Sequence, residues 1–267
     1  MTYQHITSRC FISIPFARLR QDLHFVLAHR IQPEIALEGD ALYTCAPEEF
    51  REIAAALRGA GLRCTLHAPF VDLAPGAMDR YILAASREKL RRAFALIDIF
   101  RPLSVVCHLN FEEKRQGYQE EEWFAVALAT WQEMLTMAAR HRVVLALENT
   151  YEGEPSRHAR MLAALDSPFA RLCLDVGHVM AFAKSTWQEW LPALAPWLGQ
   201  LHLHDNDGSR DEHLPPGRGI FDFPGLFSYL REKNLSPIVT LEPHSEKDLW
   251  ESLAALDRME LFPKKQQ

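Results

Sequence analysis

Residues 143–148 of the chain read VVLALE, a short apolar run that ends in a carboxylate. Side chains alternate across a strand, so Val143, Leu145 and Leu147 would pack against covering helices while Glu148 points to the opposite side with the smaller residues. The stretch therefore predicts a buried strand that presents a carboxylate at its C-terminal end.

Similar runs recur about eight times, and segments of helical periodicity fill the intervals. We expect strands at 11–14, 34–37, 64–67, 105–109, 143–148, 171–175, 200–204 and 238–242, and clear helices at 47–58, 78–100, 120–140, 224–233 and 246–259, the last capped by Ser245. Such alternation is typical of parallel strands joined by crossover helices. Eight units in about 250 residues, without a glycine-rich phosphate turn after the first strand, favour an α/β fold of the (β/α)8 TIM barrel type over a doubly wound sheet. We expect residues 1–267 to form a single domain.

Composition and charge restrict the class of protein. The 267 residues are 48% apolar and 24% charged, as in globular proteins with a substantial core. The formal net charge of −6 argues against a nucleic-acid partner, although a local patch or bound cations can supply positive potential that a net count misses. Five cysteines without a pairing pattern indicate free thiols in a reducing compartment. Since the sequence shows neither a signal segment nor a membrane-length apolar run, we expect a cytoplasmic protein without a membrane partner.

Six of the expected strands end in a ligand-type side chain on the inner face. The residues that would gather at the C-terminal rim, where barrel enzymes place their chemistry, are His67, His108, Glu148, Asp175, His202, His204 and Glu242. Each also has an ordinary interpretation, because a single inward histidine is usually a hydrogen-bonded core residue and a single carboxylate can cap a helix or pair with an arginine. Three carboxylates that converge without nearby Lys or Arg would repel one another, however. A bound cation is the simplest way to neutralise them.

Two further spacings supply additional ligands. His178 lies shortly after Asp175 in the sequence. We expect Gly177, between them, to allow a tight turn that brings the imidazole back over the site. Asp211 and His213 form another pair in the long loop after the seventh strand. Mixed histidine and carboxylate ligands suit zinc, manganese or iron better than calcium or magnesium, and we expect one to three divalent ions, Zn2+ or Mn2+.

The motifs around these residues resemble those of the xylose-isomerase-like TIM barrel superfamily, which includes sugar phosphate isomerases and epimerases and endonuclease IV-type enzymes. The matching stretches are HAPF at 67–70, LEN at 147–149, LDVGH at 174–178, HLHD at 202–205, DEHLPPGRG at 211–219 and LEP at 241–243. The resemblance runs from about the first strand to Glu242.

The two branches of the superfamily imply different chemistry. Resemblance to the isomerases and epimerases implies one metal ion held by Glu148, Asp175, His202 and Glu242, with Glu148 and Glu242 moving a proton beside a substrate carbonyl through a metal-stabilised enediolate. Resemblance to endonuclease IV, an AP endonuclease, implies three zinc ions for phosphodiester cleavage. Their ligands would be the same four residues together with His67, His108, His178, Asp211 and His213.

The loops expected at the rim contain few basic residues, whereas a nuclease that follows a DNA backbone needs several phosphate contacts from Lys and Arg. The segment at 72–79 also resembles the corresponding loop of the small-sugar members. We therefore expect an isomerase or epimerase whose partner is a small-molecule sugar or sugar phosphate. A multi-zinc phosphodiesterase is the alternative and a catalytically silent binding barrel the third hypothesis; an oligomer is compatible with all three.

Four further residues are candidates for lesser roles. Asn149 and His204 lie beside expected ligands and suit substrate hydrogen bonds or support of those ligands. Arg218, between two glycines, could clamp a substrate phosphate or hydroxyl, although an exposed arginine is ordinarily solvated surface. Glu38, after the second strand, is a rim candidate for which an ion pair with a loop arginine is an equal alternative.

Overall fold

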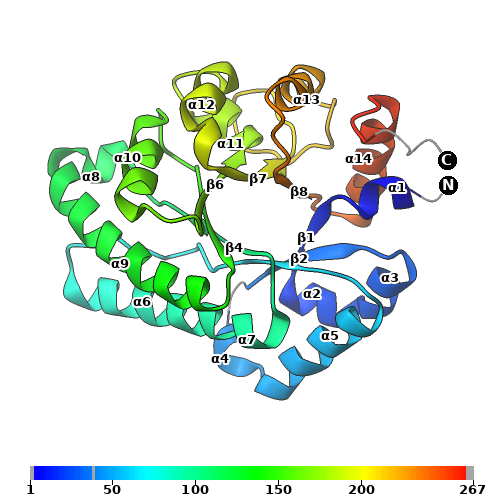
Figure 1. Ribbon diagram of the computed structural model, residues 1–267, viewed down its shortest axis with the longest axis horizontal. Coiled ribbons are helices and arrows are strands. Elements are labelled where there is room, and N and C mark those ends of the chain that lie inside the picture. The colour runs from blue at the N-terminus through cyan, green and yellow to red at the C-terminus, as the bar shows by residue number, and fades with distance from the viewer. Residues whose placement is uncertain (1–2, 38–39, 263–267) are drawn as a thin grey trace.

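Eight parallel strands close into a barrel in the computed structural model of the protein, which describes residues 3–37 and 40–262 (Figure 1). The strands pair in chain order, and β1 closes the ring against β8. Their bounds are β1 Phe11–Pro15, β2 Gln32–Ala36, β3 Thr65–His67, β4 Ser104–His108, β5 Val144–Glu148, β6 Ala170–Asp175, β7 Leu198–Leu203 and β8 Ile238–Leu241. The (β/α)8 TIM barrel expected from the alternating pattern is confirmed.

Helices surround the barrel on its outer side (Figure 1). They are α1 Gln4–Thr7, α2 Phe16–Gln21, α3 Leu23–Ala28, α4 Ala41–Thr44, α5 Pro47–Gly59, α6 Arg80–Ala95, α7 Ile97–Phe100, α8 Glu113–Gln116, α9 Glu120–Arg140, α10 Ser156–Leu165, α11 Val176–Phe182, α12 Trp187–Leu194, α13 Phe223–Glu232 and α14 Glu246–Arg258, with short 3-10 helices at Gly117–Gln119 and Ala195–Trp197. Helices α1 and α14 lie side by side, and His5 Nε2 is 2.9 Å from Asp257 Oδ1. Within the described ranges, no helix is both long enough and apolar enough to cross a bilayer.

The predicted elements overlap the observed ones, with small differences at their ends. The helix expected at 78–100 is divided into α6 and α7. Helix α6 begins only at Arg80 because the Asp79 carboxylate accepts hydrogen bonds from the N–H groups of Tyr81 and Ile82. The predicted cap of α14 is confirmed, since Ser245 Oγ accepts a hydrogen bond from the Asp248 N–H at 3.1 Å.

Strand β5 shows the side-chain alternation that its sequence predicts. Leu145 and Leu147 are fully buried in the main core between strands and helices. Ala146 belongs instead to a small separate cluster with Val106 and Cys173, contributed by the neighbouring strands. The inner row thus consists of small or polar residues, and β5 carries its terminal carboxylate to the mouth of the barrel.

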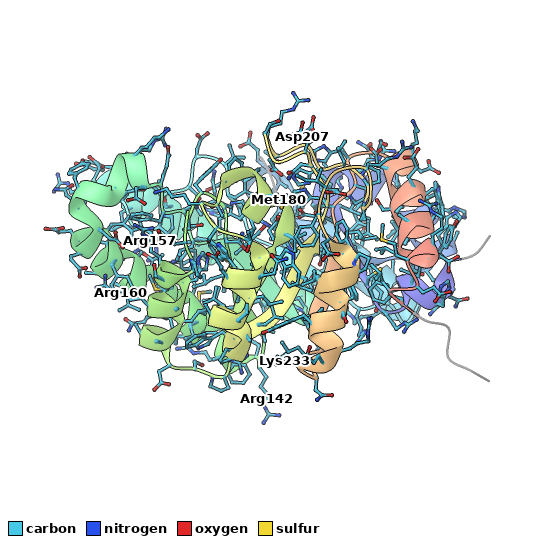
Figure 2. All side chains as sticks on the ribbon, turned by 90° about the horizontal axis from the view of Figure 1, so that it is seen from above. Arg142, Arg157, Arg160, Met180, Asp207 and Lys233 are labelled. Carbon is cyan, nitrogen blue, oxygen red and sulfur yellow. The ribbon has the colours of Figure 1, made fainter. Side chains whose placement is uncertain are left out.

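The loops that precede the strands and the loops that follow them lie at opposite ends of the barrel. Figure 2 shows Asp207, from the loop after β7, on one edge of the molecule, and Arg142 and Lys233, which precede β5 and β8, on the opposite edge. The C-terminal ends of all eight parallel strands therefore open on the edge that Asp207 marks.

Candidate active site

Three carboxylates at the ends of strands converge on one ring nitrogen of His202. His202 Nδ1 lies 3.1 Å from Glu148 Oε1, 3.1 Å from Glu242 Oε1 and 3.8 Å from Asp175 Oδ2. His202 lies within β7, Glu148 and Asp175 end β5 and β6, and Glu242 directly follows β8. Glu148, Asp175 and His202 are buried, whereas Glu242 keeps 11% of its side chain exposed.

Glu34, inside β2, lies beside the other nitrogen of this imidazole. Its Oε1 lies 2.9 Å from His202 Nε2, and its Oε2 accepts hydrogen bonds from Thr65 Oγ1, Gln200 Nε2 and Thr240 Oγ1. When Nδ1 carries the proton it can donate to Glu148, whereas a proton on Nε2, beside Glu34, would leave the Nδ1 lone pair facing three carboxylates. A lone pair among anions is unfavourable, so this arrangement fits a divalent cation bound by one imidazole and three carboxylates.

Protons must balance the charge of this cluster when no cation does. Burial alone would lower the pKa of His202, but Cys173 and nearby carboxylates, Glu242 foremost among them, raise it well above its usual value. Burial alone would raise the pKa of Glu148, yet His202 and His108 hold it well below its usual range. The Glu148 carboxylate thus stays ionised and needs a positive partner, which either protons or a metal ion can provide.

The second oxygen of Glu148 faces two more histidines. Glu148 Oε2 lies 3.0 Å from His67 Nε2, at the end of β3, and 3.3 Å from His108 Nε2, at the end of β4. His67 Nδ1 is 2.8 Å from the Ala68 C=O, to which only a protonated nitrogen can donate. The Nε2 lone pair of neutral His67 therefore points at Glu148, and the carboxylate of Glu148 is shared between two groups of ligand-type side chains.

A further group comes mostly from the loop after β7. Asp211 Oδ2 lies 3.1 Å from His213 Nε2 and 3.3 Å from His178 Nε2. These three residues and His204 offer ligand atoms that all lie within 4.8 Å of one another. In the described part of the chain, three buried atoms of this group, His204 Nδ1, Asp211 Oδ1 and His213 Nδ1, have no hydrogen-bond partner. Buried polar atoms are normally satisfied, so these atoms fit a bound cation.

Asp205 fixes the loop that supplies this group. Its carboxylate accepts hydrogen bonds from the backbone N–H groups of Gly217, Gly219 and Phe221 at 2.8–3.1 Å. Its own backbone N–H and C=O pair with those of Leu214 at 2.8 Å. One fully buried carboxylate thus ties both ends of the loop together over the barrel mouth.

The role expected of Gly177 is wrong. Gly177 does not form a tight reversal with positive φ but lies in the first turn of α11, which directly follows β6. A Cβ atom at this position would lie 1.9 Å from the His204 ring, so the glycine is required for close packing. His178 reaches the site because Asp175 caps the helix, its Oδ1 accepting a hydrogen bond from the His178 N–H at 2.7 Å.

The three residues considered for substrate contact have different environments. Asn149 is engaged with the backbone of Asp175, donating to its C=O at 3.0 Å and accepting from its N–H at 2.9 Å. His204 Nε2 lies 3.0 Å from Asp175 Oδ1, and the His204 ring stacks on the His213 ring with 3.9 Å between centroids. Arg218 is not brought to the site: its guanidinium is exposed and pairs with Glu251 of α14 at 3.0 Å. Asn149 and His204 both hold Asp175 in place.

Sequence reasoning did not single out three buried carboxylates that hold other groups in place: Glu34, Asp205 and Glu152. For Glu34 a signal existed, because an acidic residue inside an otherwise apolar strand must have a partner when it is buried. Asp205 and Glu152 lie in loops, where no periodic pattern indicates which way a side chain points. Glu38 lies outside the described residues.

Seven of the ligand-type side chains border a cavity of about 620 Å³ at the barrel mouth. Its walls include His67, His108, Glu148, His178, Asp211, His213 and Glu242, with Phe70, Tyr151 and Phe182 among the aromatic residues. Of the described residues that line it, Arg115 is the only lysine or arginine. A cavity of this size suits a small molecule.

Two comparisons with solved structures show the fold. A D-tagatose 3-epimerase-like protein superposes with a TM-score of 0.81 at 21% sequence identity, covering 93% of this chain and 96% of that one. The TTHB071 protein from Thermus thermophilus, in crystals soaked with ZnCl2, superposes with a TM-score of 0.79 at 22% identity, covering 97% of this chain and 99% of that one.

Sequence comparisons lead to the family. The uncharacterized protein MJ1311 of Methanocaldococcus jannaschii is 25% identical over 190 residues, which cover 68% of this chain and 65% of the relative, just under two thirds of its length. Residues 32–261 match the family model described as xylose isomerase-like TIM barrel. Since that match takes in most of the barrel and every ligand-type residue described above, the chain belongs to the xylose isomerase-like TIM barrel family.

Proposed function

We propose that the protein is a divalent-metal-dependent isomerase or epimerase that acts on a small sugar or sugar phosphate. The convergence of Glu148, Asp175 and Glu242 on His202 Nδ1, beside a cavity of about 620 Å³, carries the proposal. These four side chains suit a divalent cation, which a substrate in the cavity could approach past Glu242. Membership of the family and the fold shared with an epimerase-like protein support the same assignment.

The reaction would move a proton on a carbon next to the substrate carbonyl. A cation held by the four residues would supply a Lewis acid that polarises the carbonyl and the adjacent hydroxyl. Glu148 and Glu242, from β5 and β8, would face the reacting carbon from different sides, one taking a proton and the other returning one, with an enediolate in between. Glu242 is the more accessible of the two, with 11% of its side chain exposed against 1% for Glu148, and is better placed to act first.

A metal-dependent phosphoester hydrolase is the second candidate, favoured by the ligand-type groups beyond the first. His178 Nδ1 is 2.8 Å from the Asn149 C=O, so the Nε2 lone pair of neutral His178 points at Asp211, as that of His67 points at Glu148. Each of these histidine–carboxylate pairs suits an additional ion, and such ions could bind phosphoester oxygens. A nuclease also needs Lys and Arg contacts along the DNA backbone, however, and Arg115 alone does not supply them. The isomerase or epimerase therefore ranks first.

Proton exchange tests the assignment directly. Metal-loaded protein incubated in deuterium oxide with a panel of ketoses and ketose phosphates should introduce deuterium at the carbon next to the carbonyl. The number of ions per chain, from elemental analysis, accompanies this test. If fully loaded protein exchanges no proton across the panel but cleaves a phosphodiester or abasic-site DNA, the isomerase assignment is wrong and the hydrolase replaces it.

A further inference from the structure

Two polar side chains that line the cavity each have a buried atom without a hydrogen-bond partner. In the described part of the chain, Asn110 Nδ2 and Thr150 Oγ1 are buried and form no hydrogen bond. Thr150 is 4% exposed, and neither residue belongs to the ligand-type groups. An unpaired buried donor is costly, and because these two lie at the wall of one cavity, a ligand bound there would be placed to satisfy both.

A buried carboxylate holds the two positions together. Glu152 is 1% exposed and accepts hydrogen bonds from the N–H of Phe111 at 2.9 Å and of Thr150 at 2.7 Å. Phe111 directly follows Asn110, whose backbone adopts the left-handed conformation with φ of 61°. Since β4 and β5 pair with His108 opposite Glu148, both orphaned groups lie just beyond the same pair of strand ends. The pair is thus built into the wall rather than carried on free loops.

A cation accompanies these donors. Arg115 lies on the same β4–α9 connection as Asn110 and is the single lysine or arginine among the described residues of the cavity wall. Its side chain is 78% exposed and contacts Glu112 Oε2 at 3.0 Å, so it can reorient toward a ligand at small cost. An amide N–H, a hydroxyl and a guanidinium together donate hydrogen bonds to an anionic oxygen-rich group.

We propose that Asn110, Thr150 and Arg115 form a subsite for the phosphoryl group of a phosphorylated sugar. The inference rests on the proposed function and narrows its substrate class to ketose phosphates. It assigns to these residues the role that the sequence suggested for Arg218, whose guanidinium pairs with Glu251 instead. The sugar would then extend from this subsite along the cavity wall toward Glu148 and Glu242.

Binding affinities test the subsite without requiring turnover. Calorimetry on the metal-loaded protein would compare ribulose 5-phosphate with ribulose for the natural chain and for Thr150→Val, Asn110→Asp and Arg115→Gln. We expect each substitution to weaken binding of the phosphate ester by about tenfold or more, since each removes a hydrogen bond to a charged group. Affinity for ribulose should change little.

Matched variants separate binding from folding. Thr150→Ser keeps the hydroxyl and should retain the preference for the phosphate ester. Asn110→Gly keeps the left-handed backbone but removes the amide, so this variant should lose that preference. Equal losses for both ligands, or a preference that Thr150→Val, Asn110→Asp and Arg115→Gln leave intact, would overturn the subsite. Selective loss in a protein that catalyses no proton exchange would support the subsite while contradicting the proposed function, so the two failures are distinguishable.

Discussion

The ligands that end strands and the ligands carried by the loop after β7 are held in different ways. Asp175 and His202 have fully buried side chains on paired residues of adjacent strands, and backbone hydrogen bonds of the sheet fix both. Asp211 and His213 keep 23% and 17% of their side chains exposed, and His213 has a left-handed backbone with φ of 52°. Asp205 is the main anchor of their loop.

This difference indicates a division of labour. A ligand on a strand of a closed barrel is in position before any ion arrives, so little entropy is lost when the ion binds. A ligand on a loop must be ordered by the ion, by Asp205, or by both. We therefore expect the strand-borne set to define the reacting centre and the loop-borne set to respond to occupancy.

The largest effect should come from the two carboxylates that face the reacting carbon. Glu148→Gln and Glu242→Gln keep the shape of the side chain but remove the base, and each should lower proton exchange by about two to four orders of magnitude. Both residues are also expected metal ligands, so exchange is measured at saturating metal, where metal content should fall only modestly. Deuterium incorporation measured together with elemental analysis separates these outcomes. Glu251→Gln, a surface change on α14, should leave exchange unaffected.

Metal affinity should distinguish the strand-borne from the loop-borne ligands. Asp175→Asn should weaken the tightest ion by at least about a hundredfold, since loss of even an outer partner of a ligand costs about ten- to a hundredfold. Asp211→Asn should spare that ion and affect only weaker ones. Competition with a chelator of known affinity measures both. Equal loss in the two variants, or loss confined to Asp211→Asn, would show that the loop is the primary anchor.

Glu34 should have a smaller effect, because it would influence the ion through His202 rather than bind it directly. Glu34→Gln keeps the side-chain size but removes the negative charge beside His202 Nε2, and that charge favours a proton on Nε2 and a free Nδ1. We expect the affinity of the tightest ion to fall by about tenfold to a hundredfold while the fold is retained. Unchanged metal affinity with a lowered unfolding midpoint would show that Glu34 stabilises the barrel interior and has no role in metal binding.

The sequence predicted the strand-borne part of this comparison better than the loop-borne part, for a physical reason. Alternation along VVLALE fixes which side of the sheet Glu148 occupies, and the same periodicity placed Asp175 and His202. Loops have no such period, so neither the anchoring role of Asp205 nor the true partner of Arg218 could be read from neighbouring residues.

The same limit applies to contacts between distant segments. The need for glycine at position 177 depends on the His204 ring, which another strand supplies. The orphaned atoms of Asn110 and Thr150 depend on how two loops meet at Glu152. Only the folded chain shows such contacts, because residues far apart in the sequence make them.

The smallest effect should appear in the pH dependence of stability when ions are removed. Burial lowers the pKa of His213, but its hydrogen bond to Asp211 and nearby carboxylates raise it to about 9. A raised histidine pKa stabilises the fold fully below the unfolded value of about 6.5, and this contribution is lost as pH rises to about 9. The pKa values of His178 and His202 shift in the same direction.

Chelated protein should therefore lose on the order of 5 °C in unfolding midpoint between pH 6.5 and 9. Zn2+- or Mn2+-loaded protein should not, because the ions replace the protons. His213→Gln should reduce the loss in chelated protein. A flat profile for chelated protein would mean that protons do not stabilise the empty site.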